Sequence, residues 1–365
     1  MMLDTRHALL ALAALCLTGC DPTAEPEQGF AGLGAEVEGF APVSPNVPLR
    51  FPVDHASHPD YRIEWWYVTA NLEDERGRAW GVQWTLFRQA LEPQTPAEAA
   101  AGWRSAQVWL GHAAVTRADA HRFADRLARG GIGQAGVSTD PFQAWIDHWS
   151  LGAVPDSSVS DPLDALRVTA SGDDFSYALQ LRSERPLVLH GDQGYSRKSA
   201  GEQASYYYSQ PFYQAKGTIE WEGEQIPVTG QAWLDREWSS QPLAGDQRGW
   251  DWFSLHLDGG QKLMLFRLRS AEDQAFVSGS WVSAEGKVTA LDGGQITMQE
   301  RAQTRVAGRK VPTSWRLQVP SRNLDIEVQA LNAQSWMGTS IPYWEGPVRI
   351  TGNRQGMGYL EMTGY

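Results

Sequence analysis

The chain has 365 residues, of which 42% are hydrophobic, and its formal net charge is −12. Because an acidic chain without a cluster of Lys and Arg repels a phosphate backbone, nucleic acid is not expected as a partner. The length suggests two domains, and the 17 Trp, 11 Tyr and 11 Phe favour β-strands, since aromatic rings suit the half-buried surface of a sheet.

The first twenty residues are typical of an exported lipoprotein. An apolar run over residues 8–17 is too short to span a bilayer, and it ends in Leu17-Thr18-Gly19-Cys20, which resembles a bacterial lipobox. We therefore expect residues 1–19 to be a signal peptide and Cys20 to carry a lipid; the alternative is an ordinary signal peptide with a chance cysteine. The other cysteine, Cys16, lies in the same segment, so no disulfide is expected in the mature chain.

Residues 20–49 are acidic and rich in Pro, Gly and Ala, without periodicity. This composition predicts a flexible tether between the lipid and the folded part. Asp21 resembles the signal that retains some lipoproteins in the inner membrane. We therefore expect the protein to be held by its lipid on the periplasmic side of that membrane.

From Phe51 onward, short runs of alternating hydrophobicity are separated by turn residues, which is typical of antiparallel β-structure. Helix is suggested only by residues 97–101 and 120–128, so the expected fold class is all-β. The predicted strands are residues 62–72, 80–90, 107–115, 142–151, 165–170, 175–183, 216–221, 226–233, 250–257, 262–269, 276–283, 314–319, 325–331 and 347–352.

Two hairpins of the same type indicate two tandem β units. A strand that begins at Trp66-Tyr67 returns at residues 86–88, and a strand that begins at Trp252-Phe253 returns at residues 265–267. We expect a first domain over residues 50–210 and a second over 211–365, each closed as a barrel or sandwich to protect its strand edges. Small barrels with aromatic interiors commonly hold one apolar ligand.

The first of three polar segments among large aromatic residues is residues 58–67. Strand alternation places Arg62, Glu64 and Trp66 on one face. If Glu64 faces a dry interior, its pKa should rise and it becomes a candidate acid. The alternative is a structural ion pair of Glu64 with Arg88 or Arg62.

The second segment, residues 233–253, contains three carboxylates, Asp235, Glu237 and Asp251, with Arg236 available to keep one of them ionised. Carboxylates in unlike environments are what general acid–base chemistry at neutral pH requires. The alternative is a buried ion-pair network that holds a loop on the barrel.

The third segment combines Tyr343, within residues 341–346, with the aromatic C-terminal residues 358–365, which should dock into the sheet. His112 is a lone histidine on a predicted strand, a setting more typical of a core residue than of a ligand-binding one. The sequence contains no metal-spaced His, Asp and Glu cluster, nucleophile elbow, phosphate-binding loop or dinucleotide fingerprint. We therefore expect no metal or cofactor, and serine hydrolases, nucleotide enzymes and zinc enzymes are disfavoured.

These segments resemble the family of the carotenoid 1,2-hydratases (hydroxyneurosporene synthases) and the AttH-like, lipocalin-like proteins. The resemblance implies two lipocalin-like β-barrel domains, a site near their interface, and an apolar or isoprenoid-like ligand. The matching pieces are Glu64-Trp65-Trp66-Tyr67, Gly111-His112-Ala113, Tyr206-Tyr207-Tyr208-Ser209, Asp235-Arg236-Glu237-Trp238, Gly249-Trp250-Asp251-Trp252-Phe253, Pro342-Tyr343-Trp344-Glu345-Gly346 and Gly358-Tyr359.

From these pieces we assign candidate residues to two roles. In an enzyme, Asp235, Glu237 and Asp251 would be catalytic. The candidate ligand-binding residues are Glu64, Trp66, His112, Arg236, Trp238, Trp252 and Tyr343.

Two functions are compatible with this resemblance. Lipoprotein members of the family tend to accompany ABC-type export permeases, which favours a membrane-anchored protein that binds a lipid or other hydrophobic molecule. The alternative is a hydratase, which needs an acid that protonates carbon, aromatic faces that stabilise the carbocation, and a positioned water. In the hydratases a histidine implicated in acid–base work stands at the position of Arg236, and a permanently charged guanidinium cannot replace it. Carbohydrate binding by exposed Trp is a weaker third reading, because the Trp positions alternate as core positions do.

Overall fold

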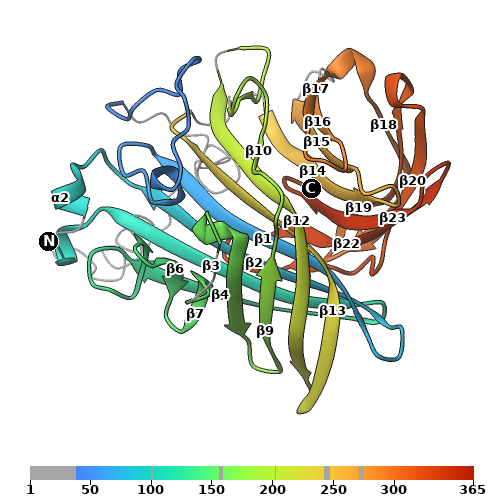
Figure 1. Ribbon diagram of the computed structural model, residues 1–365, viewed down its shortest axis with the longest axis horizontal. Coiled ribbons are helices and arrows are strands. Elements are labelled where there is room, and N and C mark those ends of the chain that lie inside the picture. The colour runs from blue at the N-terminus through green and yellow to red at the C-terminus, as the bar shows by residue number, and fades with distance from the viewer. Residues whose placement is uncertain (1–37, 100–101, 156–158, 202, 242–246, 271–274) are drawn as a thin grey trace, which may run out of the picture.

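The computed structural model describes residues 38–99, 102–155, 159–201, 203–241, 247–270 and 275–365. These residues form two antiparallel β-sheets that lie side by side, the first drawn in blue to yellow and the second in orange to red (Figure 1). Cys20, the expected signal peptide and the first part of the expected tether lie outside the described residues. Within the described ranges, no helix has the length and hydrophobicity needed to cross a bilayer.

The first sheet has the strand order β4-β3-β2-β1-β13-β12-β9-β8-β7-β6-β5, with β10 and β11 also paired to β12. Contacts of β6 with β2, β3 and β4 bring its two ends together as a barrel. Its strands are β1 (Ile63–Asp74), β2 (Ala79–Ala90), β3 (Gln107–Arg117), β4 (Ala120–Arg129), β5 (Ala135–Thr139), β6 (Phe142–Ile146), β7 (Trp149–Ala153), β8 (Ala165–Ser171), β9 (Phe175–Arg182), β10 (Val188–Leu189), β11 (Tyr195–Arg197), β12 (Ala204–Trp221) and β13 (Glu224–Ser239).

The second sheet has the order β17-β16-β15-β14-β23-β22-β20-β19-β18, with β21 paired to β22. Its strands are β14 (Gln247–Leu257), β15 (Lys262–Ser270), β16 (Phe276–Val282), β17 (Val288–Asp292), β18 (Thr297–Val306), β19 (Arg309–Val319), β20 (Leu324–Ala330), β21 (Trp336–Met337), β22 (Tyr343–Gly352) and β23 (Gly356–Met362). The helical turns of the chain are η2 (Val53–His55), α2 (Pro96–Ala99), η3 (Gly102–Arg104), η4 (Pro162–Asp164), η5 (Gly293–Gln295) and η6 (Pro320–Arg322).

The all-β prediction and both predicted hairpins are confirmed, since β1 pairs with β2 and β14 pairs with β15. The helix predicted over residues 120–128 is wrong, because these residues form strand β4. Ala120, Ala124 and Ala128 pack against the core at a spacing of four residues. That spacing fits one face of a strand as well as one face of a helix, so it cannot distinguish the two.

The predicted boundary between domains at residues 210 and 211 is also wrong. It falls inside β12, a continuous strand, and β13 remains in the first sheet. The chain passes to the second sheet only after Ser239, before Gln247. The similarity of the two hairpins does not determine to which sheet the strands between them belong, which is why the predicted boundary is misplaced.

The expected tether does not extend to residue 49. The amide of Ala41 donates to the carbonyl of Asp60, and Val43 is 5% exposed within the first core. The backbone of Ser44 exchanges two hydrogen bonds with the hydroxyl of Tyr206. Residues 41–49 are therefore part of the folded domain, fixed by a few apolar side chains that the overall composition of the segment obscured.

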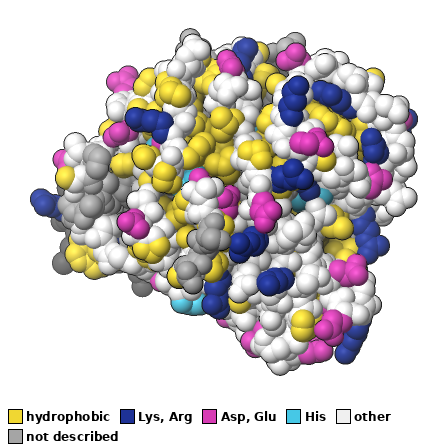
Figure 2. Space-filling model, in the orientation of Figure 1, with side chains coloured by type: hydrophobic (Ala, Val, Ile, Leu, Met, Phe, Trp, Pro, Cys, Tyr) yellow, Lys and Arg dark blue, Asp and Glu magenta, His cyan; other side chains and the backbone are white. Residues whose placement is uncertain are grey.

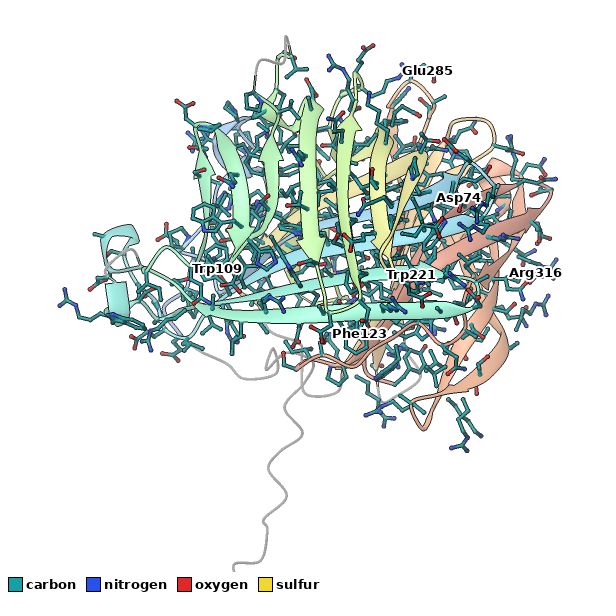
Figure 3. The ribbon with its side chains drawn as sticks, turned by 90° about the horizontal axis from the view of Figure 1, so that it is seen from below. Asp74, Trp109, Phe123, Trp221, Glu285 and Arg316 are labelled. Atoms are coloured by element: carbon teal, nitrogen blue, oxygen red, sulfur yellow. The ribbon has the colours of Figure 1, made fainter. Side chains whose placement is uncertain are left out.

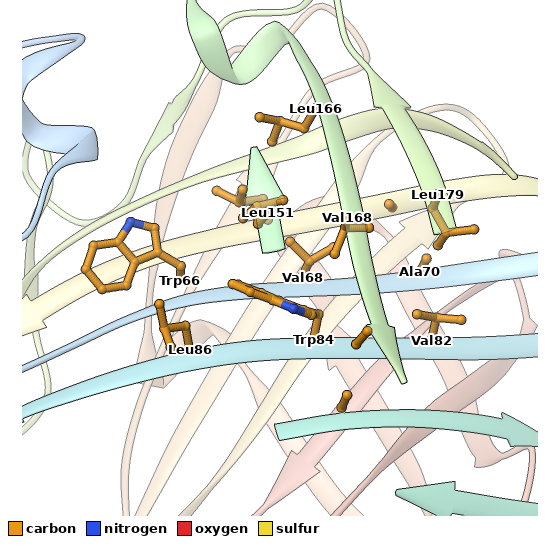
Figure 4. Close-up of a cluster of buried hydrophobic side chains, with 14 of the residues drawn as sticks. Trp66, Val68, Ala70, Val82, Trp84, Leu86, Leu151, Leu166, Val168 and Leu179 are labelled. Carbon is orange, nitrogen blue, oxygen red and sulfur yellow. The ribbon is translucent and has the colours of Figure 1, made fainter. Parts of the chain in front are cut away.

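The core of the first barrel is built from the even-numbered residues of β1. Figure 4 shows Trp66, Val68 and Ala70 packed with side chains of β2 against Leu151, Leu166, Val168 and Leu179 of β7, β8 and β9. Pairs of tryptophans lie at its two ends, Trp66 stacked on Trp109 and Trp80 edge-on to Trp221, and Figure 3 shows Trp109 and Trp221 far apart along the barrel. Burial of these rings supplies much of the hydrophobic stabilisation.

The odd-numbered residues of β1 point out of the first barrel, toward the second sheet. Near the far end of β1 the two sheets touch directly, since Asn71 Nδ2 donates to the carbonyl of Gly358 at 2.9 Å. Gly81 permits this approach, because a Cβ atom there would lie 2.5 Å from both Pro347 Cγ and Tyr359 Oη. The two sheets therefore form one packed unit.

We predict that Gly81→Ala destabilises the protein by about 1–3 kcal/mol, because the added methyl group overpacks the contact between the sheets. The measurement is thermal unfolding followed by near-ultraviolet circular dichroism. Gly294→Ala is the matched control, since a Cβ there meets nothing within 4 Å. Equal melting temperatures for the two variants would contradict the assigned contact.

Candidate active site between the two sheets

The outer faces of the two sheets enclose a cavity of about 150 Å³. A space of that size is far larger than one water molecule and holds a small apolar group such as a benzene ring. Aromatic and aliphatic side chains dominate its lining: Ile63, Trp65, Tyr67, Phe87, Leu110, Tyr207, Trp250, Trp252, Phe266, Leu268, Ile341 and Tyr343. Its polar lining includes Glu64, Arg88, Gln89, His112, Lys198, Gln203, Ser205, Asp235, Glu237, Ser239, Gln241, Gln247 and Glu361.

The first wall consists of rows of cross-strand neighbours on the outer face of the first sheet. The inner row crosses β12, β13, β1, β2 and β3, and the next row lies one step nearer the start of β1. The inner row is Ser209, Asp235, Tyr67, Thr85 and His112, and the next row is Tyr207, Glu237, Trp65, Phe87 and Leu110.

The second wall is the outer face of β15, β14, β23 and β22. One row of cross-strand neighbours there is Phe266, Trp252, Glu361 and Glu345. Tyr67 of the first wall donates a short hydrogen bond to Glu345 of the second. The walls are thus joined across the junction, and Tyr67 also packs edge-on against Trp252 at 5.3 Å.

The cavity has a buried floor and a more open mouth. Tyr67, His112 and Asp235 on the floor are at most 4% exposed, whereas Trp65, Phe87 and Lys198 nearer the mouth are partly exposed. Figure 2 shows hydrophobic side chains gathered at the upper middle of the visible face, where Figure 1 places β10 and the β14 end of the second sheet. An apolar ligand would thus meet aromatic surface before it reaches the polar floor.

Asp235 is a carboxyl group of the floor that forms no ion pair with a cation of the described part of the chain. Its Oδ1 accepts hydrogen bonds from Tyr207, Ser209 and Trp233 Nε1. Among the described residues none donates to Oδ2. Burial raises the pKa of Asp235 to about 7, against the lowering effect of these hydrogen bonds. A substantial share of Asp235 is therefore protonated at neutral pH and can act as an acid.

A chain of hydrogen bonds behind Asp235 reaches the second sheet. Ser209 donates to Asp235 and lies 2.6 Å from Nε2 of His190, whose Nδ1 lies 2.8 Å from Ser280 Oγ on β16. Burial, and secondarily the charge of Lys198, lower the pKa of His190 to about 3, so the ring is neutral. The chain holds Oδ1 in place and leaves Oδ2 as the free carboxyl oxygen.

Glu237, the neighbour of Asp235 on the same strand face, has a different environment. Lys198 Nζ lies 2.7 Å from its Oε1, and Ser205 also donates to that oxygen. The ammonium of Lys198 additionally lies over the rings of Tyr207 and Phe266. The two carboxyl groups of this wall therefore differ in environment, because Glu237 has a cation beside it and Asp235 does not.

Two further carboxyl groups, which the sequence analysis did not select, lie on the second wall. Burial raises the pKa of Glu361 to about 7, assisted by the charges of Asp235 and Glu237, and Trp250 Nε1 donates to Glu361 at 2.6 Å. Burial, then the charge of Glu361, raises the pKa of Glu345 well above its usual range. Among the described residues, no group of three His, Cys, Asp or Glu is placed to hold a metal ion.

His112 and Tyr343 meet across the cavity floor. His112 Nδ1 lies 3.0 Å from the Tyr343 hydroxyl, and the two rings are stacked. Burial lowers the pKa of His112 to about 4, so the imidazole is neutral. Trp252 also lines the cavity, and its Nε1 donates to the Tyr207 hydroxyl at 3.2 Å.

Glu64 is not an acid with a raised pKa, which corrects one of the two readings of its position. Burial alone would raise its pKa, but the guanidiniums of Arg88 and Arg236 outweigh burial and hold the pKa well below its usual range. Although Glu64 belongs to the cavity wall, its carboxylate is fully paired. The alternative prediction, a structural ion pair of Glu64 with Arg88, is confirmed.

Trp66, Arg236 and Trp238 do not line the cavity, contrary to their assignment as ligand-binding residues. All three side chains lie inside the first barrel. There the Arg236 guanidinium carbon lies 3.9 Å from the ring centroid of Trp66 and 4.9 Å from that of Trp238. Strand alternation is the reason, because these even-numbered residues face away from Asp235 and Glu237. Position 236 is therefore part of the barrel core.

Asp251 is likewise misassigned as a catalytic residue. It lies on the inner side of the second sheet, 2.6 Å from Arg267 Nε and 3.4 Å from Arg269 Nε, and it accepts a hydrogen bond from Tyr365. Burial raises its pKa, and the two arginines oppose that shift. The structure brings Asp235 and Glu237 together at the cavity and places Asp251 in an ion-pair network instead.

We predict that Glu64→Gln destabilises the protein by about 3–5 kcal/mol at pH 7, because it leaves Arg88 and Arg236 buried without an anion. Urea unfolding measures the effect, and Glu73→Gln, at an exposed position of the same strand, is the control. The folded pKa of Glu64 lies below its unfolded value of about 4.3, so its stabilisation is lost as the pH falls below that value. A gap between wild type and variant that does not shrink from pH 6 to pH 3 would contradict this role.

These features define a protein class: two tandem antiparallel barrels with a partly polar cavity at their junction. The chain belongs to the AttH-like family, which matches residues 42–365. It is similar to a Nitrosomonas europaea protein assigned as AttH, with 33% identity and a TM-score of 0.78 over 89% of this chain and 99% of that one. Kievitone hydratase of Nectria haematococca has the same fold, with 14% identity and a TM-score of 0.66 over 89% and 96%. No curated protein sequence matches. The expected family and the expected pair of lipocalin-like barrels are confirmed.

Proposed function

We propose that this protein is a hydratase that adds water to the carbon–carbon double bond of a small isoprenoid-like substrate in the cavity between the barrels. One observation carries the proposal: Asp235, with a pKa of about 7 and a free Oδ2, lies in an aromatic cavity. Burial raises the pKa of two carboxyl groups of this largely apolar lining, Asp235 and Glu361, and perturbed carboxyl groups in a cleft are typical of catalysis. A structural relative is a kievitone hydratase, which supports the same reaction class.

The reaction begins with proton transfer to carbon. The proton on Asp235 Oδ2 moves to the less substituted alkene carbon, the π electrons form the new C–H bond, and positive charge develops on the other carbon. The rings of Trp252 and Trp65, which line the cavity, are the candidate charge-stabilising groups. A desolvated cation over such a face gains about 2 kcal/mol, which lowers the barrier to the cation.

Water completes the reaction from the mouth. Its oxygen forms the C–O bond, and its proton passes to Glu237, so that water is added across the double bond and an alcohol is released. Lys198 orients the Glu237 carboxylate. Asp235 has then lost one proton and Glu237 has gained one, and exchange with solvent at the mouth restores both groups.

The arginine at position 236 does not oppose this mechanism. Its side chain is buried inside the first barrel, and Arg236 is not among the described residues that line the cavity. Arg236 would count against a hydratase only if position 236 faced the substrate. Asp235 supplies the acid without a histidine at that position.

We predict that Asp235→Asn lowers the rate of alkene hydration by at least about 10²-fold, since general acid catalysis typically contributes that much. In the wild type, kcat/KM should fall as the pH rises through about 7, because Asp235 loses its proton. Gas chromatography of product from geraniol, an alkene with a terminal isoprenoid group, measures the rate. Unchanged turnover in the variant would rule out Asp235 as the acid.

Stability measurements provide the control for this variant. The folded pKa of Asp235 exceeds its unfolded value of about 3.9, so wild-type stability falls as the pH rises from about 4 through 7. Asparagine does not titrate, and the variant should gain on the wild type by on the order of 1–4 kcal/mol between pH 5 and pH 8. Lost activity in a variant that shows this relative gain and is still folded at pH 7 does not result from unfolding.

A second candidate function remains the one expected first from the sequence, a lipid-anchored periplasmic carrier of a hydrophobic molecule that works with an ABC-type permease. The apolar lining of the cavity supports ligand binding in either case. Attachment through Cys20 is compatible with both functions, and we propose it for both. A carrier would bind its ligand without chemical change, so that the Asp235→Asn protein would be fully functional.

For the anchor, we predict that cells labelled with radioactive palmitate incorporate label into the wild-type chain, and that Cys20→Ala abolishes it and moves the protein to the soluble fraction. Cys16→Ala is the matched control and should retain label and membrane association, because Cys16 precedes the expected cleavage site. An unlabelled wild-type chain would show that residues 1–20 are an ordinary signal peptide.

A further inference from the structure

The imidazole of His112 presents an unsatisfied nitrogen at the cavity floor. His112 is 1% exposed, and its Nε2 has no hydrogen-bond partner among the described residues, although Nδ1 lies 3.0 Å from the Tyr343 hydroxyl. A buried polar atom without a partner is destabilising, and such atoms are rare in native proteins. Because His112 lines the cavity, the missing partner can come from a bound molecule.

The surroundings of His112 restrict the chemistry of that partner. Phe87 packs edge-on against the imidazole at 5.2 Å and Tyr343 is stacked on it at 5.6 Å. The ring is neutral, since burial lowers its pKa to about 4, and the nearby carboxyl groups disfavour an anion. A neutral imidazole nitrogen is either a donor or an acceptor, and a hydroxyl group satisfies both forms.

We propose that His112 binds a hydroxyl group of the substrate, so that the substrates are alkenes that carry a hydroxyl remote from the double bond rather than pure hydrocarbons. This inference rests on the proposed function of the cavity, because Asp235 fixes where the double bond lies. Asp235 and His112 share one cross-strand row, separated by Tyr67 and Thr85.

The separation of these two residues sets the shape of the ligand. They are three strands apart, which places their Cα atoms roughly 14 Å from each other at about 4.8 Å per strand. Both side chains point to the same side of the sheet, so a molecule that reaches both carries its double bond and its hydroxyl several bonds apart. Trp65 and Phe87, in the adjacent row, supply apolar surface for the chain between the two groups.

Binding of two probes to the full chain tests the proposal, with tryptophan fluorescence as the readout. Geraniol carries a terminal trisubstituted alkene and a hydroxyl, and 2,6-dimethylocta-2,6-diene is the same skeleton without the oxygen. The wild type should bind geraniol roughly 10- to 100-fold more tightly, the range expected for satisfying one buried polar group. His112→Phe retains a ring for stacking but lacks the nitrogen, and its preference should fall to about one.

A second measurement guards against a variant that does not fold. In wild-type protein labelled with ¹⁵N-histidine, geraniol should shift the Nε2 resonance of His112 and the hydrocarbon should not. Equal affinities of the wild type for the two probes, or an unmoved Nε2 resonance, would overturn the role of His112.

Failure of this inference is distinguishable from failure of the proposed function. If geraniol binds preferentially but neither probe is hydrated, the His112 site stands and the hydratase proposal is wrong. If both probes are hydrated but bind equally, the hydratase proposal stands and His112 does not select the substrate.

Discussion

The outer face of strands β12, β13, β1, β2 and β3 carries large aromatic side chains, among them Tyr67, Tyr207, Trp65 and Phe87, and the second sheet covers it. At one end the cover is tight, because Gly81 lets Pro347 and Tyr359 approach the first sheet. At the other end, large rings such as Trp65 and Trp252 hold the walls apart. The cavity is the space that remains when two twisted sheets with aromatic faces are in full contact at one end only, and Asp235 and Glu237 lie along it.

Buried carboxyl groups separate into two kinds by the presence or absence of a cation. Glu64 and Asp251 contact arginines inside the first and second barrels, where they serve the stability of those barrels. Asp235 and Glu361 face the cavity without such a partner, and burial raises the pKa of both to about 7. Desolvation acts on all of these carboxyl groups. Where an arginine offsets its cost, the carboxylate stabilises the fold, and where no cation does so, the carboxyl group keeps a raised pKa and can transfer a proton.

Much of the fold could be predicted from the sequence, because the period-two pattern of apolar residues defines strands directly. Of the candidate site, Asp235, Glu237, His112, Trp252 and Tyr343 do line the cavity, whereas Trp66, Arg236, Trp238 and Asp251 do not. Alternation divides a strand into two faces, but which face meets the second sheet depends on contacts between residues more than a hundred positions apart. For the same reason, Glu361 and Lys198 could not be selected: nothing near them in sequence marks the approach of Glu361 to Asp235 or of Lys198 to Glu237.

The hydrogen-bonded series Ser280, His190, Ser209 and Asp235 begins on β16 of one barrel and ends on β13 of the other. The orientation of the acid is therefore a joint property of both halves of the chain. An exchange of either barrel for that of a distant relative would preserve each fold while disturbing this alignment. The two halves are thereby constrained to be inherited together.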